Sequence, residues 1–430
     1  MDISQRTKNL GTEQAFVVLA EVEKLKSQGR DIISFCIGQP DFVTPDNIRE
    51  AGIKAIKDGK TGYTASAGIP ELRQAVAKYL SKTRNIKISA NEVVIANGQK
   101  PFIMYAIASV TDFGKGHEVL YPVPGYPIYE SQIIAQGAMP RPLPLLEKNG
   151  FKFDIKTLAK GINKNTRLLI LNTPQNPTGS VLTKNDLIAI SKILKKYKDV
   201  WVFSDEIYSR IIYPVRNRIS NGVYDKKFIS IASLPGMRER TIIADGVSKI
   251  YAMTGWRIGF AANKILAPSF ERWMTNITAC ANHIAQYAAL EALSGSQKEP
   301  EKMVRIFKER RDLIVSGLNS IRGIKCLKPD GTFYVWPNVT KACKISGTKN
   351  AEDFRKKLLI EAGVAVLADI HFGPRIKGEG QHIRLSFATS TENIKEGLKR
   401  IKNYIDKYVS LDFSEIKNLH IKQLEIVKKL

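Results

Sequence analysis

The sequence predicts an α/β protein. Its large domain is expected to have a mostly parallel sheet of the seven-stranded type covered by helices, and a smaller α+β domain is expected beside it. Short apolar runs alternate with longer helical patterns through the middle of the chain, which is typical of parallel sheets. This pattern changes after a long helix expected near 299–322. The 430 residues are also too many for one ordinary domain.

The predicted strands of the large domain are short and apolar without clean alternation, as expected when helices cover both faces of a sheet. In chain order they lie at 92–96, 117–121, 166–171, 200–204 and 241–244. A helix is expected from about 98 to 110. Thr183, with Asp186 three residues on, forms a capping-box-like start for another helix that runs to about Lys196.

The second half of the chain predicts the smaller domain. Strands are expected at 332–336 and 382–387, and helices near 351–362 and 391–408. The residues from Leu411 onward suggest an extra amphipathic helix. The expected division is therefore 1–44 as an N-terminal arm and part of the small domain, 45–300 as the large domain, 301–410 as the small domain, and 411–430 as the extra helix.

Composition excludes several classes of function. The net charge is +25, but the lysines are spread along the chain rather than gathered in one patch, so nucleic-acid binding is not expected. No stretch approaches the roughly 18 continuous apolar residues of a membrane span. The four cysteines lie far apart and form no Cys-x-x-Cys pair. We therefore expect reduced thiols, no metal site and a cytoplasmic location.

Two polar clusters directly follow predicted strands, at the end where ligands of α/β sheets bind. The segment 172–179, Asn-Thr-Pro-Gln-Asn-Pro-Thr-Gly, predicts a rigid turn, which is either a binding loop or a plain connection. Asp205 follows an apolar run, so its carboxylate needs a cationic partner. A protonated pyridine nitrogen would serve; the alternative is a helix N-cap.

Three further residues carry candidate chemistry. Lys249 lies between a buried strand and a glycine-rich turn, where a lowered pKa and a Schiff base are favoured. Arg257 supplies a planar fork suited to a phosphate. The alternatives are a solvated lysine and a surface arginine. Arg384 lies in an alternating strand and points either to solvent or into a site that binds a carboxylate.

Together these segments resemble the class I aminotransferases, the fold-type I pyridoxal-phosphate enzymes, and most closely their bacterial aspartate-aminotransferase-like branch. The motifs Asn-Pro-x-Gly, Ser-Asp-Glu-Ile-Tyr and Ser-Lys-x-Tyr-Ala-Met-Thr-Gly-Trp-Arg-Ile-Gly occur in order, at 176–179, 204–208 and 248–259. Further matches lie at 37–42, 62–64, 68–73, 124–127 and 383–386. The resemblance runs from about 10 to about 408, and leaves extra sequence around 216–227 and in the tail.

The resemblance implies pyridoxal 5'-phosphate as cofactor and a role for each matched residue. Lys249 would carry the cofactor and move the proton, and Asp205 would keep the pyridine nitrogen protonated. Tyr208 and Asn176 would bind the phenolic oxygen, and Tyr126 would stack on the ring.

The remaining implied roles concern the phosphate and the substrate. The phosphate would lie at a helix N-terminus, and the residues implied for it are Gly98, Gln99, Lys100, Ser248, Arg257 and, from a partner subunit, Tyr63. The residues implied for the substrate are Gly38, Tyr126, Asn176 and Arg384.

The implied reaction is ping-pong transamination between an L-amino acid, such as aspartate or glutamate, and a 2-oxo acid such as 2-oxoglutarate, in a homodimer. Other pyridoxal-phosphate chemistry at the same site, as a β-lyase, deaminase or oxidase, stays open. A non-enzymatic regulator with this fold is less favoured, because the segment before Gly38 is too short for a DNA-binding module.

Overall fold

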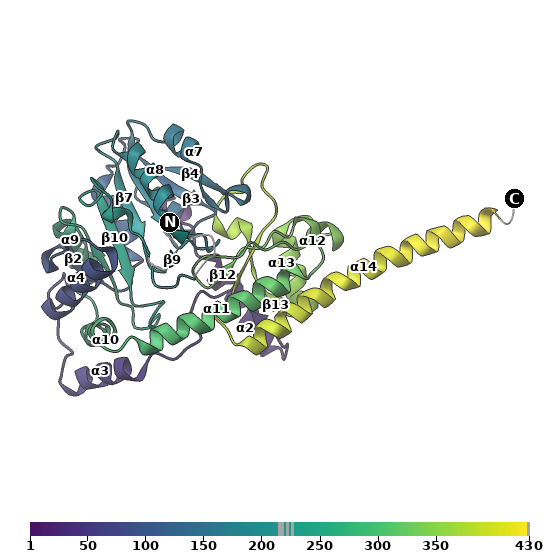
Figure 1. Ribbon diagram of the computed structural model, residues 1–430, viewed down its shortest axis with the longest axis horizontal. Coiled ribbons are helices and arrows are strands. Elements are labelled where there is room, and N and C mark those ends of the chain that lie inside the picture. Colours follow the sequence, from purple (N-terminus) through teal and green to yellow (C-terminus); the bar gives the residue numbers. More distant parts are fainter. Residues whose placement is uncertain (214–218, 221–222, 225–227, 428–430) are drawn as a thin grey trace.

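The computed structural model describes residues 1–213, 219–220, 223–224 and 228–427, with side chains over 1–213 and 228–410. An eight-stranded sheet forms the centre of its larger part (Figure 1). In spatial order its strands are β2 (Val93–Ala96), β11 (Gly259–Ala262), β10 (Thr241–Gly246), β7 (Trp201–Asp205), β6 (Thr166–Asn172), β3 (Glu118–Val123), β4 (Met139–Leu146) and β5 (Lys152–Phe153). The run from β10 to β4 is parallel, whereas β11 and β5 are antiparallel to their neighbours. The predicted α/β fold class is confirmed.

Helices cover both faces of this sheet because its strands are apolar on both sides. In β6, Leu168 and Ile170 are buried in a different hydrophobic cluster from Leu169 and Leu171. The first cluster includes residues of α5 (Pro101–Val110), α6 (Ile128–Ala135) and α9 (Ala267–Thr278). The opposite face is covered by α7 (Ile155–Gly161), α8 (Lys184–Leu194), α4 (Pro70–Arg84) and α10 (His283–Ser294). The predicted capping box of Thr183 and Asp186 begins α8.

A smaller sheet has the order β12 (Tyr334–Val335), β15 (Ile383–Ser386), β14 (Leu367–Ala368). Beside it, β1 (Ile33–Ser34) of the N-terminal segment pairs in parallel with β13 (Val364–Ala365). The helices of this part are α2 (Gln14–Ser27), α11 (Lys298–Asn319), α12 (Thr340–Ile345), α13 (Ala351–Ala362) and α14 (Thr391–Val427). The other short elements are α1 (Gln5–Lys8), α3 (Asp46–Lys57), β8 (Ile219–Ser220), β9 (Val223–Tyr224), η1 (Ala90–Glu92), η2 (Glu147–Asn149), η3 (Ile231–Ser233) and η4 (Asp369–Phe372).

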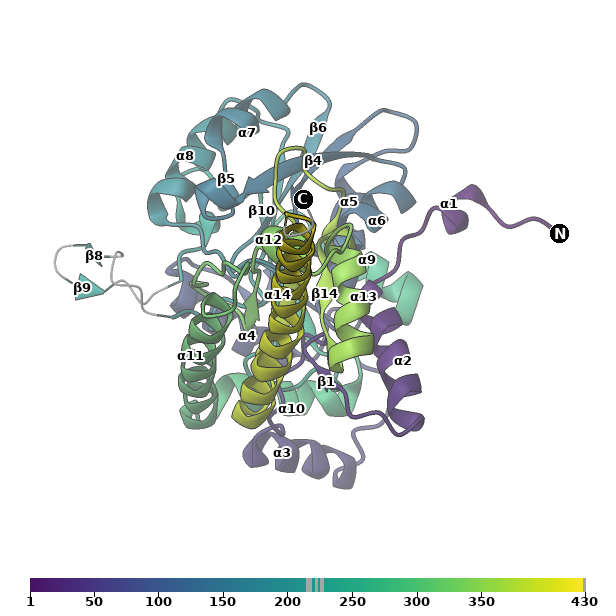
Figure 2. The same cartoon turned by 90° about the vertical axis from the view of Figure 1, so that its right-hand side faces the viewer.

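The two extra segments differ in how far they are described. The helix expected at 391–408 and the separate one expected from Leu411 form a single helix, α14, which ends at Val427. Its distal half extends away from the body of the molecule (Figure 1), and the N-terminal segment with α1 also projects outward (Figure 2). The segment 216–227 lies outside the described residues apart from the hairpin of β8 and β9. Over the described residues, each helix is either too short or too polar to cross a bilayer.

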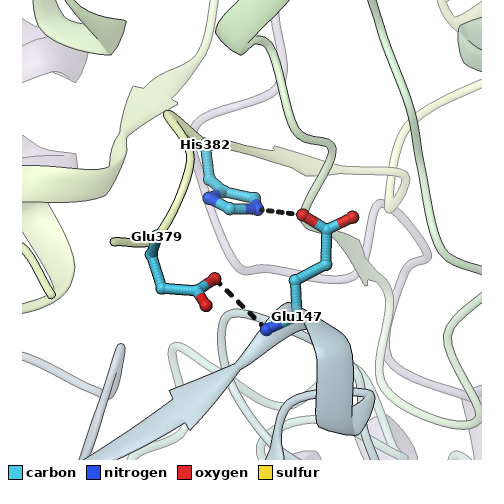
Figure 3. A group of neighbouring side chains, drawn as sticks. All are labelled: Glu147, Glu379 and His382. Atoms are coloured by element: carbon cyan, nitrogen blue, oxygen red, sulfur yellow. Dashed lines mark hydrogen bonds and ion pairs between the residues drawn. The ribbon is translucent and has the colours of Figure 1, made fainter. Parts of the chain in front are cut away.

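A group of polar side chains joins the two sheets (Figure 3). Glu147 follows β4 of the large sheet, and His382 directly precedes β15 of the small one. His382 Nε2 lies 3.3 Å from Glu147 Oε2, and the Glu147 backbone N–H donates to Glu379 Oε2 at 3.2 Å. Asn338 donates to Glu147 at 2.6 Å, and Lys325 Nζ lies 3.5 Å away. Protein groups thus already satisfy the Glu147 carboxylate, which makes this group a contact between the sheets.

Candidate active site

A cavity of about 450 Å³ opens at the carboxyl ends of the parallel strands β6, β7 and β10. Ligands of α/β sheets bind at this end. The cavity contains every residue that the sequence assigned to the site except Gly98 and Tyr63. Its lining consists of Glu13, Ala15, Phe16, Ile37, Gly38, Gln39, Gln99, Lys100, Tyr126, Tyr129, Asn172, Asn176, Asp205, Ile207, Tyr208, Ser248, Lys249, Thr254, Gly255, Arg257, Tyr334 and Arg384.

Asp205 is the last residue of β7 and is only 4% exposed. Tyr129 Oη donates to its Oδ2 at 2.6 Å, and the Ile207 backbone N–H donates to Oδ1 at 3.3 Å. Burial raises the pKa of Asp205 to about 6, although these two donors oppose the shift. Among the described residues no cation forms an ion pair with this carboxylate, so a cationic ligand group would find an unneutralised partner here.

Lys249 follows β10 and is half-buried at the cavity wall. Its Nζ donates to the Gly38 carbonyl at 2.7 Å. Burial lowers the pKa of Lys249 to about 8; the charge of Glu13 opposes this shift, and the nearby Arg384, Arg257 and Lys100 add to it. A lysine in this environment is partly neutral near pH 8, which makes it a usable nucleophile and base.

Arg384 lies in β15 and points into the cavity rather than to solvent, since it is only 4% exposed. Its Nη1 donates to Asn176 Oδ1 at 3.0 Å and its Nη2 to the Cys36 carbonyl at 2.5 Å. The buried Nε has no hydrogen-bond partner among the described residues. The guanidinium is thus fixed in place, and each Nη keeps a second N–H that suits a carboxylate ligand.

The loop before α5 lies beside Arg257. Gly98 has a φ of +93°, and a Cβ there would meet Arg257 Nη2 at 2.0 Å, so only glycine allows this approach. Arg257 Nη1 donates to the Thr254 carbonyl at 3.0 Å, and Nη2 to the Asn97 carbonyl at 3.3 Å. An exposed guanidinium thus lies at the N-terminal end of α5, where the helix dipole also favours an anion.

Three site residues escaped the sequence analysis: Glu13, Tyr129 and Tyr334. Tyr334 Oη lies 2.8 Å from Tyr208 Oη, and a Cβ on Gly38 would meet Tyr334 Oη at 1.9 Å. Tyr334 lies in the strand predicted at 332–336, but the pattern of that strand did not indicate the contact with Tyr208. Glu13 lies well before Gly38, the first residue assigned to the site, so no local pattern could have placed it in the cavity. Tyr129 lies three residues after the predicted Tyr126, but the sequence did not indicate its hydrogen bond to Asp205.

A buried ion-pair cluster supports the strand ends from the far side of the site. Arg84, from α4, donates through Nε to Glu206 Oε2 at 2.8 Å and through Nη2 to Asp245 Oδ2 at 2.5 Å. Glu206 follows β7, and Asp245 lies at the end of β10. Arg84 therefore fixes the two strands that carry Asp205 and lead to Lys249.

These observations fit pyridoxal 5'-phosphate. The unneutralised Asp205 suits a protonated ring nitrogen, Lys249 suits an aldehyde, and Arg257 beside the α5 N-terminus suits a phosphate. The Gln99 side chain lies close enough to Asp205 to lower its pKa, yet its buried Nε2 lacks a partner of good hydrogen-bond geometry among the described residues. Tyr63 is 90% exposed and lies outside the cavity lining of its own chain.

Comparison with known proteins gives one consistent result. Residues 30–401 match the family described as aminotransferase class I and II. The chain is 35% identical to an asparagine–oxo-acid transaminase of Streptococcus mutans, over 94% of this chain and 99% of that protein. It is 33% identical to an aspartate aminotransferase of Bacillus subtilis, over 95% of this chain and 100% of that protein. The crystal structure of an aspartate aminotransferase from Rhizobium meliloti superposes with a TM-score of 0.86 at 31% identity, covering 94% of this chain and 99% of that one.

Proposed function

The chain belongs to the class I and II aminotransferases, and from this premise we propose that it transfers the amino group of an L-amino acid to a 2-oxo acid such as 2-oxoglutarate by a ping-pong mechanism. As an enzyme of this family it uses pyridoxal 5'-phosphate. The observation that supports the reaction is the meeting of Lys249, Asp205 and Arg384 in one cavity. Asp205 has the charge and burial needed to bind the cofactor ring nitrogen, Lys249 those needed for proton transfer, and Arg384 those needed to bind the substrate carboxylate.

The cofactor, when bound, supplies an aldehyde and an electron-withdrawing ring that accepts negative charge from the reacting carbon. Asp205 would hold the ring nitrogen in its protonated form. Tyr208 and Asn176 would bind the phenolic oxygen, and Tyr126 would cover the ring. The phosphate would be held by Ser248, Arg257 and the backbone of the loop of Gly98, Gln99 and Lys100, with Tyr63 reaching it from a second subunit.

Lys249 is the proposed base that removes the α-proton of the amino acid. It would then donate this proton to the cofactor carbon. Its depressed pKa supports this role, because a general base works best with a pKa near the working pH. Its hydrogen bond to the Gly38 carbonyl places the amine at the cavity wall.

Arg384 is the proposed receptor for the α-carboxylate of every substrate. Nη1 and Nη2 each use one N–H in the contacts with Asn176 and Cys36, and the second N–H of each would form a planar two-point contact with the carboxylate. Gly38, Asn176 and Tyr126 would complete this subsite. The common carboxylate contact explains why amino acid and oxo acid would use the same cavity in turn.

Aspartate, glutamate or a related amino acid is the proposed donor, since the named relatives act on asparagine or aspartate.

A cytoplasmic homodimer is also proposed. The location is supported by the four cysteines, which are all unpaired. The dimer is supported by Tyr63, which is exposed away from the cavity of its own chain. We further propose that 45–300 folds as the cofactor-binding domain, with 1–44 and 301–410 around the small sheet and 411–430 as an extension.

A half-reaction screen tests this function. Each L-amino acid is added alone to the cofactor-loaded protein, and oxo acid and ammonia are quantified. We expect about one oxo acid per site without an acceptor, and continued turnover only when 2-oxoglutarate is present. Continuous release of ammonia without an acceptor would instead assign a deaminase or β-lyase.

A further inference from the structure

Glu13 brings a carboxylate into the active-site cavity from the N-terminal segment. It directly precedes α2, which is anchored through Val18 and Val22 in a buried cluster beside the small sheet. Glu13 Oε2 accepts hydrogen bonds from Lys100 Nζ at 3.0 Å and from Tyr126 Oη at 2.9 Å. Glu13 is therefore held in the cavity wall by two residues that the cofactor and substrate are also expected to approach.

The charged residues of the cavity show what Glu13 contributes to it. Asp205 is buried beside Tyr129 at the end of β7, whereas Glu13 lies beside Lys100 at a more exposed part of the wall. The acidic lining residues are Glu13 and Asp205, and the basic ones are Lys100, Lys249, Arg257 and Arg384. Without Glu13, Lys100 would be a free cation in the substrate cavity, and a free cation there would favour a substrate with a second carboxylate.

With Glu13 present, the cavity wall at Lys100 offers a hydrogen-bond acceptor, Glu13, next to a donor, Lys100. Glu13 Oε1 accepts no hydrogen bond from the described part of the chain. The Lys100 ammonium has three donor hydrogens, and one of them is directed to Glu13. A carboxamide matches this pair, because its NH₂ group donates and its carbonyl accepts. A carboxylate can only accept, so it meets Lys100 favourably but is repelled by Glu13.

We propose that Glu13 and Lys100 together select amino acids with a terminal carboxamide, of the asparagine or glutamine type, over the corresponding dicarboxylic amino acids. The amide nitrogen donates to Glu13, and the amide oxygen accepts from Lys100. Glu13 is the specificity-determining residue, because it turns a cationic wall into a neutral donor–acceptor pair. This inference rests on the proposed transamination, and among the related amino donors proposed above it ranks asparagine and glutamine ahead of aspartate and glutamate.

Binding of unreactive analogues tests the role of Glu13 without catalysis. Calorimetry on the cofactor-loaded protein compares succinate with succinamate, its monoamide. We expect the wild type to bind succinamate at least tenfold more tightly than succinate, and Glu13→Gln or Glu13→Ala to lower this ratio at least tenfold. Glu23→Gln is the matched control, since Glu23 lies in α2, the helix that Glu13 precedes, but pairs with Lys26 at 3.5 Å, away from the cavity. It should keep the wild-type ratio.

Half-reaction rate constants at limiting substrate give the second readout. The asparagine-to-aspartate ratio should fall at least tenfold in Glu13→Gln. Tighter binding of succinate than of succinamate by the wild type, or an unchanged ratio in both Glu13 variants, overturns the inference. Failure of the proposed function looks different, because the wild type would then either release ammonia continuously without an acceptor or release no oxo acid from any amino acid, alanine included.

Discussion

Asp205 and Lys249 have opposite charges, and burial drives both toward their neutral forms. Burial raises the pKa of Asp205 to about 6 and lowers that of Lys249 to about 8. A cationic ring nitrogen would reverse the shift at Asp205, and condensation with an aldehyde would use the neutral amine of Lys249. The two shifts therefore describe a cavity prepared for a ligand that supplies the missing partners.

The first prediction concerns Lys249. In the cofactor-free protein, its reactivity toward trace acetic anhydride should be half-maximal near pH 8, because burial favours the neutral amine. Mass-spectrometric mapping of the labelled peptide across a pH series measures this. In urea the same peptide should titrate near the free lysine value of about 10.4. Identical profiles in the folded and unfolded protein would contradict the prediction.

Asp205→Asn should keep the cofactor bound but slow the half-reaction at least about 100-fold, equivalent to about 2.7 kcal/mol of barrier. The amide has nearly the same shape, yet it cannot balance the charge of a protonated ring nitrogen. Single-turnover kinetics with a good donor measure the rate. Tyr129→Phe is the comparison, since it removes one hydrogen bond to Asp205 and leaves the carboxylate. A near-wild-type rate in Asp205→Asn would refute the role.

At the level of elements, the sequence predicts most strands that are buried on both faces, although the buried strand β11 was not predicted. Buried strands such as β6 and β10 stand out as apolar runs, and the structure confirms them. β4 was not predicted because Pro140, Pro142 and Pro144 interrupt its pattern. These prolines are two residues apart, so their missing N–H groups all face one side of the strand, which leaves the ladder with β3 intact.

In the site, too, the sequence predicts residues that lie in local motifs and misses those that only packing brings into the cavity. Lys249, Asp205 and Arg257 could be predicted because each lies in a contiguous motif beside a strand end. Glu13, Tyr129 and Tyr334 could not, because their roles depend on how α2, α6 and β12 pack around the cavity. The break expected before Leu411 is absent from α14 because no residue there forces a helix to stop; the stretch lacks glycine and proline.

The next prediction concerns the ion pairs that Arg84 forms at the ends of β7 and β10. Arg84→Met should lower the free energy of unfolding by about 3–5 kcal/mol, because it leaves Glu206 and Asp245 buried without a cation. Chemical denaturation of the cofactor-free protein measures the change. Lys82→Met is the control, since Lys82 is exposed on the same helix. A loss as small as in that control would mean that the two carboxylates are neutralised in another way.

The whole molecule depends on contacts between the two sheets, and Glu147 provides a pH-dependent one. The hydrogen bond with His382 is the main cause that lowers the pKa of Glu147 from 4.5 to about 2. The stabilisation by ionised Glu147 is therefore complete above pH 4.5 and is lost as the pH falls toward 2. Glu147→Gln should be less stable than the wild type at pH 6, and urea denaturation should show this difference shrinking between pH 4.5 and 2. A difference independent of pH would contradict the assignment.

The last prediction concerns assembly and rests on Tyr63. It lies between α3 and α4 and is 90% exposed, and Val43, Ile53 and Ile56 are exposed in the same part of the sequence at 70%, 42% and 57%. An exposed apolar surface of this kind is typical of an interface, and two-fold dimers are the commonest assembly. We therefore expect Tyr63 to complete the phosphate site of the partner subunit.

Subunit mixing tests this expectation, provided that Tyr63→Ala alone is severely impaired. A hybrid of Tyr63→Ala and Lys249→Ala chains holds one site with both residues intact and one with neither. After random exchange, half of the dimers are hybrids, so about a quarter of wild-type activity should return if two-fold dimers form. Asp205→Asn mixed with Lys249→Ala is the control, because both defects lie within each chain's own site and every hybrid site keeps one of them. If the Tyr63 mixture recovers no more activity than this control after exchange is demonstrated with distinguishable tags, Tyr63 does not act across the interface.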